Sequence, residues 1–269
     1  MLAGGVLLGL SGLLIVGYGL LALRLNWFPF HSAAPREVSL DEARKRYLED
    51  RVDGEDLARP FTPPEGVYRY EGSGSESLSN PPRTQLEGPL VPGTVTHRPD
   101  GCWNFRLDYS TNHWRRWSFC ADPDRLVEVG NLVSQRWDFG SFAVENLATM
   151  TCDPPGVILE AQMVVGQEWT SECRGGNSQV SGTTISTGRH RLLAIEKLTI
   201  GGAEVDASHF RDDRVVSGAQ SGTEQFDFWL AEDGLLLKGV QRISVDSDSP
   251  LGKVTYTQES AFTLVRRLP

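Results

Sequence analysis

The sequence predicts an all-β protein in which the strands form an antiparallel curved sheet or two packed β halves, preceded by one N-terminal transmembrane helix. Three observations support this prediction. Residues 2–23 form a long uncharged run. From Gly66 onward, apolar and polar residues alternate, and turn residues interrupt the pattern about every ten positions, as in antiparallel sheets. Four cysteines beyond the uncharged run stand at positions that a hairpin reading can pair.

Residues 1–30 are predicted to be a membrane anchor with an interfacial belt. As a helix, residues 2–23 would be about 33 Å long, enough to cross the apolar core of a bilayer. Aromatic residues follow at 27–30, as they do where a helix leaves a membrane. The alternative is a signal peptide that is cleaved after residues 32–34.

One face of the anchor carries four glycines. Gly5, Gly9, Gly12 and Gly19 lie within about 80° of one another on a helix that turns by roughly 100° per residue. Gly5 and Gly9 form the Gly-x-x-x-Gly pair that lets membrane helices approach closely. We expect a membrane-protein partner to pack on this face, unless the glycines only reflect how common glycine is in membrane helices.

Charge and cysteine content predict opposite orientations for the anchored domain. Basic residues such as Arg24 follow the uncharged run and none precedes it, which by the positive-inside rule places the domain in the cytoplasm. An even number of cysteines favours an oxidising compartment. We give the cysteines more weight and predict a single-pass protein of the cell membrane with its domain on the extracytoplasmic side. Because the chain has no Asn-x-Ser/Thr sequon, a bacterial envelope is favoured.

Residues 31–64 are predicted to be a juxtamembrane spacer that contains a short helix. Ser39 and Glu42 have the spacing of a capping box, which begins a charged helix over residues 40–50. Prolines at 60, 63 and 64 end any helix and mark the entry to the β domain, residues 65–269.

The clearest predicted hairpin runs from Cys102 to Cys120. Folding it at Thr111 places the two cysteines opposite each other and Phe105 opposite Trp117. One face of this hairpin then carries Arg115 together with five apolar residues: Trp103, Phe105, Leu107, Trp117 and Phe119. Cys152 and Cys173 pair by elimination, so we predict disulfides 102–120 and 152–173.

An internal duplication would explain a second pattern. Residues 116–130 resemble residues 225–239, since each segment reads as an aromatic strand, an acidic turn and an apolar strand. A true duplication would give two halves, 65–162 and 163–269. The alternative is that antiparallel hairpins resemble one another over such a short stretch.

Charge and motif content argue against several classes of function. The chain has 35 acidic and 26 basic residues, so it lacks the wide positive field that nucleic acid requires. Motifs of hydrolases, phosphate-binding loops, zinc proteases and Cys-x-x-Cys sites are absent, and the five histidines are scattered. We therefore predict no enzymatic activity, no cofactor and no metal. The titratable cluster over residues 208–213 is interpreted as a solvated turn. The alternative is that it binds a cation or acts as acid and base.

Aromatic and basic residues alternate in Trp114-Arg115-Arg116-Trp117. Because a strand alternates its faces, Trp114 and Arg116 are predicted to form an exposed interaction surface. The alternative is core packing supported by cation–π contacts.

The C-terminal third, residues 223–268, contains Phe228-Trp229-Leu230-Ala231-Glu232-Asp233-Gly234-Leu235 and Gly252-Lys253-Val254-Thr255-Tyr256. In this part the sequence resembles uncharacterised bacterial envelope families with a curved antiparallel sheet, similar to lipoprotein-carrier half-barrels. The resemblance implies an apolar groove and assigns no functional residue.

Two functions agree with these features. The first is a non-enzymatic protein-interaction or scaffold module of the cell envelope, favoured by the glycine face and the charged spacer. The alternative is that the domain binds or carries a lipid or another apolar envelope ligand. The choice depends on whether a set of aromatic side chains fills a core or lines a groove: Trp103, Phe105, Trp137, Phe226 and Phe228.

Overall fold

The segments with alternating apolar and polar residues all form strands in the computed structural model, which describes residues 36–51, 59–140, 142–249 and 252–268. Within these ranges the chain has one helix, α2 (Leu40–Asp50), and thirteen strands. The strands are β1 (Gly66–Ser79), β2 (Pro82–Glu87), β3 (Leu90–His97), β4 (Cys102–Ser110), β5 (His113–Ala121), β6 (Arg125–Asp138), β7 (Ala143–Glu160), β8 (Glu168–Asn177), β9 (Val180–Ile200), β10 (Ala203–Gly218), β11 (Gln220–Leu230), β12 (Leu236–Ser249) and β13 (Gly252–Arg267).

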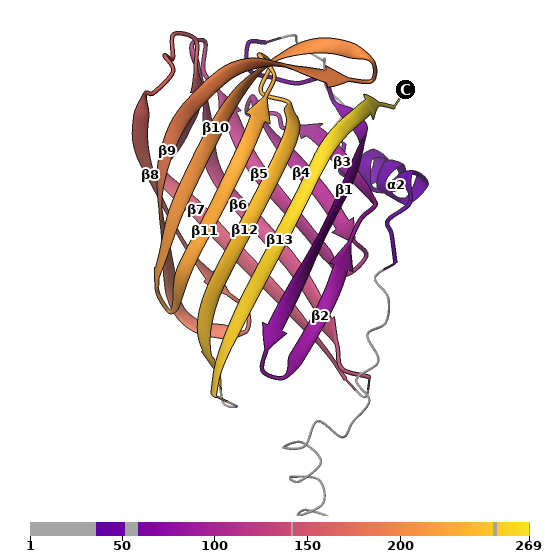
Figure 1. Ribbon diagram of the computed structural model, residues 1–269, viewed down its shortest axis with the longest axis vertical. Coiled ribbons are helices and arrows are strands. Elements are labelled where there is room, and N and C mark those ends of the chain that lie inside the picture. Colours follow the sequence, from indigo (N-terminus) through magenta and orange to yellow (C-terminus); the bar gives the residue numbers. More distant parts are fainter. Residues whose placement is uncertain (1–35, 52–58, 141, 250–251, 269) are drawn as a thin grey trace, which may run out of the picture.

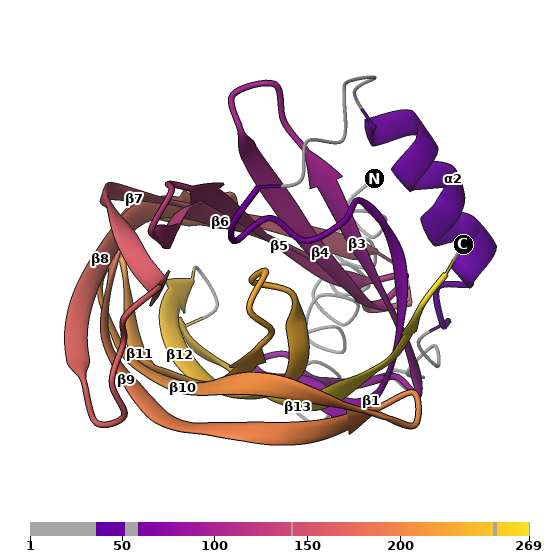
Figure 2. The same ribbon diagram turned by 90° about the horizontal axis from the view of Figure 1, so that it is seen from above.

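The strands form one antiparallel sheet that closes into a barrel (Figure 1). From β3 to β13 each strand pairs with the next strand in the sequence. β1 closes the ring because it pairs with β13, from Tyr68 opposite Arg267 to Leu78 opposite Tyr256. β2 and β3 pair with successive halves of β1, so together they occupy one position in a wall of twelve. Figure 2 shows this ring from above, with α2 outside it.

The predicted fold class is wrong in the arrangement of the sheet. The sheet is neither open nor split into two packed halves, because hydrogen bonding between β1 and β13 joins its two edges. The segments proposed as a duplication lie in the β5–β6 and β11–β12 hairpins, on opposite sides of the same wall.

The predicted transmembrane helix over residues 2–23 lies outside the described residues, as do the four glycines of its face. Among the residues that the structure describes, no helix is both long enough and apolar enough to cross a membrane.

The predicted hairpin and both predicted disulfides are confirmed. In the β4–β5 pair, Cys102 lies opposite Cys120 and Phe105 lies opposite Trp117. Disulfides join Cys102 to Cys120 and Cys152 to Cys173. The second pair links neighbouring strands β7 and β8. The predicted register of the β4–β5 pair is therefore correct.

The predicted short helix is also confirmed, and it packs on the outer wall of the barrel. Ser39 caps α2 in a capping box with Glu42. Ala43 is buried against the wall in a small cluster with Val67. The Arg46 guanidinium donates a hydrogen bond of 2.6 Å to the buried carboxylate of Asp108 on β4. This part of the predicted spacer is thus attached to the barrel.

The interior of the barrel is filled at one end and hollow at the other. An aromatic core occupies the upper end, where Phe61 and the β11–β12 connection close it. Gly234 of that connection lies against Trp103 and Leu126. At the lower end, at the bottom of Figure 1, β1 and β12 end and β2 and β13 begin, and a smaller apolar cluster surrounds Ile243. Between the two ends lies a layer of buried polar and charged side chains.

Candidate functional site

A cavity of about 460 Å³ occupies the lower end of the barrel. Its apolar wall comes from inward-facing side chains of many strands: Leu78, Val133, Trp137, Val144, Ala148, Met150, Val180, Val216, Ile243, Val245, Val254 and Tyr256. Phe142 lines the cavity and is 55% exposed, so the cavity reaches solvent beside this residue. The volume is in the range of small-molecule binding sites.

One ion pair stands at the inner end of the cavity, and we call these two residues the floor. Arg115 on β5 and Glu224 on β11 both line the cavity and come from opposite sides of the wall. Their nearest charged atoms, Nη2 and Oε1, are 3.9 Å apart. The guanidinium lies over the rings of Phe226 and Trp117, at 4.8 and 5.4 Å from their centroids. Cation–π contacts therefore support the buried charge of Arg115.

A histidine and two glutamates form a buried network beside the cavity. His113 Nδ1 lies 3.0 Å from Glu87 and 3.4 Å from Glu76. Burial alone would lower the pKa of His113, but the carboxylates raise it. Burial also raises the pKa of Glu76.

The ligand atoms of these three residues lie within 4.8 Å of one another, as at a metal site. However, each carboxylate already accepts hydrogen bonds from neighbouring side chains: Gln135, Tyr256, Gln258 and Ser260. These hydrogen bonds reach Glu76 Oε2 and both Glu87 oxygens, whereas Glu76 Oε1 and His113 Nε2 are buried without a hydrogen-bond partner among the described residues. The predicted absence of a metal stays a prediction.

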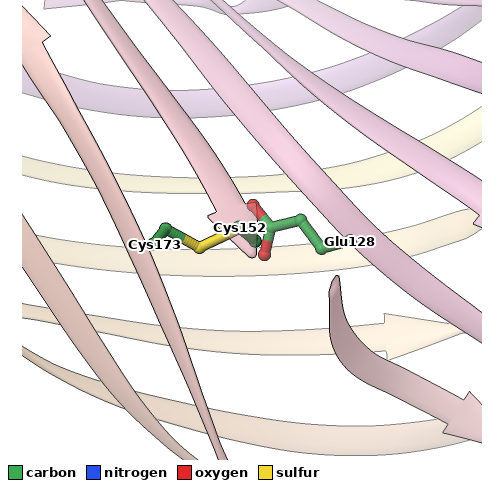
Figure 3. Close-up of side chains that lie close together, drawn as sticks. All are labelled: Glu128, Cys152 and Cys173. Atoms are coloured by element: carbon green, nitrogen blue, oxygen red, sulfur yellow. A yellow bond between two sulfur atoms is a disulfide. The ribbon is translucent and has the colours of Figure 1, made fainter. Parts of the chain in front are cut away.

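A second group of potential metal ligands lies next to a disulfide. Figure 3 shows the Glu128 carboxylate beside the bonded sulfurs of Cys152 and Cys173. A disulfide has no thiolate to offer a metal, so this group is not a metal site. Arg214 satisfies the carboxylate instead, with Nη2 3.0 Å from Glu128, and its Nη1 lies 3.6 Å from the Cys173 sulfur.

In the interior, a histidine lies between a serine and an aspartate, which is the spatial arrangement of a hydrolase triad. Ser171 Oγ is 2.6 Å from His190 Nε2, and His190 Nδ1 is 3.5 Å from Asp212. Burial raises the pKa of Asp212 to about 6, opposed by Arg214. Burial and the Arg214 charge lower the pKa of His190 to about 3.

These properties do not suit nucleophilic catalysis. An imidazole with such a low pKa is a weak general base. Ser171 lines neither the lower cavity nor the small space of about 50 Å³ within the aromatic core. The arrangement is best explained as a buried hydrogen-bond network, and the predicted absence of enzymatic activity stays a prediction.

The residues predicted as an interaction surface lie on the outer wall. Trp114 and Arg116 are both half-buried, and the Arg106 guanidinium covers the Trp114 ring at 4.0 Å. Their role in binding stays a prediction. The interpretation of residues 208–213 as a solvated turn is wrong, because they lie within β10 and Asp212 faces the interior.

Sequence reasoning missed the floor, although one signal for Arg115 was present. The predicted hairpin register put this arginine on the apolar face, beside residues that are now seen in the core. A charge on such a face has to be buried, which marks it as unusual. Glu224 carried the same kind of signal, because strand alternation places it on one face with Phe226 and Phe228.

The fold and the cavity together define a closed antiparallel β-barrel with an internal cavity. No family model and no curated protein matches the chain. Among solved structures, the chain is similar to the hypothetical lipoprotein YmcC from Escherichia coli (K12), with 12% identity and a TM-score of 0.33 over 86% of this chain and 99% of that one. The resemblance of residues 223–268 to envelope families stays a prediction.

Proposed function

We propose that the barrel binds a small amphipathic molecule in its lower cavity. The observation that carries this proposal is the cavity itself, which combines an apolar wall with a polar floor. Such a combination is typical of small-molecule sites, where apolar contacts supply affinity and a few polar groups orient the ligand.

The side chains of the wall support this proposal. Protein interiors are normally close-packed, and an apolar cavity lowers stability in proportion to its volume. Val133 on β6 and Ala148 on β7 are paired neighbours on adjacent strands, and both line the cavity. Larger apolar residues at these positions would fill the space, as Trp103 and Phe105 do at the upper end. The small residues are consistent with a space that is kept for a ligand.

The two disulfides support a location outside the cytoplasm, where such bonds persist. A lipid or another apolar molecule of a cell envelope would then be the natural ligand. The protein-interaction role predicted from the sequence has no comparable feature within the described residues, so the cavity favours ligand binding over it.

Two neighbouring residues of β7 provide a matched test. Ala148 faces the cavity, whereas Leu147 is 45% exposed on the outer wall. We expect protein purified from its host to carry lipid-sized adducts in native mass spectrometry and to bind the neutral dye Nile red. Ala148→Trp fills the cavity and should abolish both, while Leu147→Trp should leave both unchanged. Equal binding by the two folded variants, or no binding by the wild type, would contradict the proposal.

A further inference from the structure

The floor of the cavity contains hydrogen-bonding capacity that the protein does not use. The buried Nε of Arg115 has no hydrogen-bond partner among the described residues. At 3.9 Å, the contact between Arg115 and Glu224 is too long for a hydrogen bond. Leaving a buried polar group unsatisfied is costly, and more so for a charged group. Because both side chains line the cavity, a third group that approaches from the cavity side can form hydrogen bonds to the two of them at once.

The charges of the floor decide what kind of group fits there. Arg115 can only donate hydrogen bonds, and the Glu224 carboxylate can only accept them. A hydroxyl group does both, since its oxygen accepts from the guanidinium and its hydrogen is donated to the carboxylate. Other side chains that both donate and accept hydrogen bonds line the same cavity, including Asn131, Gln258 and Ser186. The buried Ser186 Oγ has no hydrogen-bond partner among the described residues.

A charged headgroup fits the floor less well. The positive charge of Arg115 and the negative charge of Glu224 balance, so a carboxylate or an ammonium would add an uncompensated charge in a buried space. The neighbouring network holds two carboxylates, Glu76 and Glu87, against one histidine. A carboxylate headgroup would therefore also meet repulsion from that side.

We propose that the cavity selects a neutral amphiphile whose inner end carries hydroxyl groups, such as a glycerol monoester or an alkyl glycoside. One hydroxyl bridges Arg115 and Glu224, and the acyl or alkyl chain runs along the apolar wall toward Phe142. This inference rests on the proposed function, because it requires that the cavity binds amphiphiles at all.

The test compares three amphiphiles with the same ten-carbon chain length in displacing Nile red: monodecanoylglycerol, decanoate and decylammonium. With the wild type, we expect the neutral glycerol ester to bind at least about tenfold more tightly than either charged compound, because of the cost of an unpaired buried charge. This comparison needs no substitution, so it decides the question even where a variant fails to fold.

Two variants shift the charge of the floor in opposite directions. Glu224→Gln leaves a net positive floor and should improve decanoate binding about tenfold relative to the glycerol ester. Arg115→Gln leaves a net negative floor and should improve decylammonium binding instead. Equal affinities for all three amphiphiles, abolished by Ala148→Trp, would overturn the headgroup selection while the proposed function stands. If no amphiphile displaces the dye, both proposals fail.

Discussion

The buried imidazole of His190 predicts how acid destabilises the barrel. His190 is 3% exposed and forms a hydrogen bond with Ser171. Its ring is stacked on the Trp169 ring, with 5.5 Å between the two ring centroids. Burial, together with the Arg214 charge, lowers its pKa from 6.5 to about 3. The folded protein therefore keeps His190 neutral at pH values where the unfolded chain protonates it.

The size of the effect follows from this difference in pKa. Between pH 6.5 and pH 3 the unfolded state binds more protons at this position than the folded state, so the free energy of unfolding falls as the pH falls. Each pH unit below 6.5 costs about 1.4 kcal/mol. The contribution of His190 at pH 5 is then a loss of about 2 kcal/mol relative to pH 7.

Urea unfolding of the wild type and of His190→Phe at pH 7 and pH 5 measures this loss. Phenylalanine keeps the ring stacked on Trp169 but does not titrate. Other buried groups, such as Asp212, titrate in both proteins, so their effect largely cancels when the two are compared. We expect the wild type to lose about 2 kcal/mol more than the variant between the two pH values. Equal losses would show that the folded protein accommodates the protonated imidazole, and the reasoning would be refuted.

Two further predictions concern packing and the attachment of α2. A Cβ at Gly175 would lie 1.8 Å from a carbonyl oxygen of β7, whereas a Cβ at Gly176 meets nothing within 4 Å. In urea unfolding, Gly175→Ala should lose about 2 kcal/mol and Gly176→Ala should stay within about 0.5 kcal/mol; similar values would disprove the close strand contact. Arg46→Ala removes a hydrogen bond to buried Asp108 and should lower the free energy of unfolding by about 2 kcal/mol. It should also speed proteolysis at α2, whereas Lys45→Ala, at a side chain that is 79% exposed, should change neither.

The features that could be predicted from the sequence depend on residues close together in the chain. A capping box involves four consecutive residues, and Ser39 with Glu42 predicted the start of α2 correctly. The β4–β5 register followed from strand alternation and from two cysteines that had to meet, Cys102 and Cys120.

Closure of the barrel could not be predicted in this way. It depends on pairing between Tyr68 and Arg267, at opposite ends of the domain, and no local pattern specifies such a pair. An edge strand and a closing strand have the same alternation of residues.

The polar interior was missed for a related reason. Asp212 and Arg214 alternate with their neighbours as residues of a solvated face do, so alternation shows that two faces exist without showing which one is inside. The aromatic side chains posed the same problem. Trp103 and Phe105 are buried in the core, whereas Trp137 lines the cavity, and this difference depends on the height of each residue in the barrel.

The pairing of β1 with β13 also determines when the fold can be completed. β13 contains residues 252–267, so the ring can close only after these residues are available to pair with β1. Until then both sheet edges present unpaired backbone groups, which can bind other extended chains. Contacts between such distant residues also form slowly. When β13 pairs with β1, both of these edges become hydrogen-bonded within the barrel.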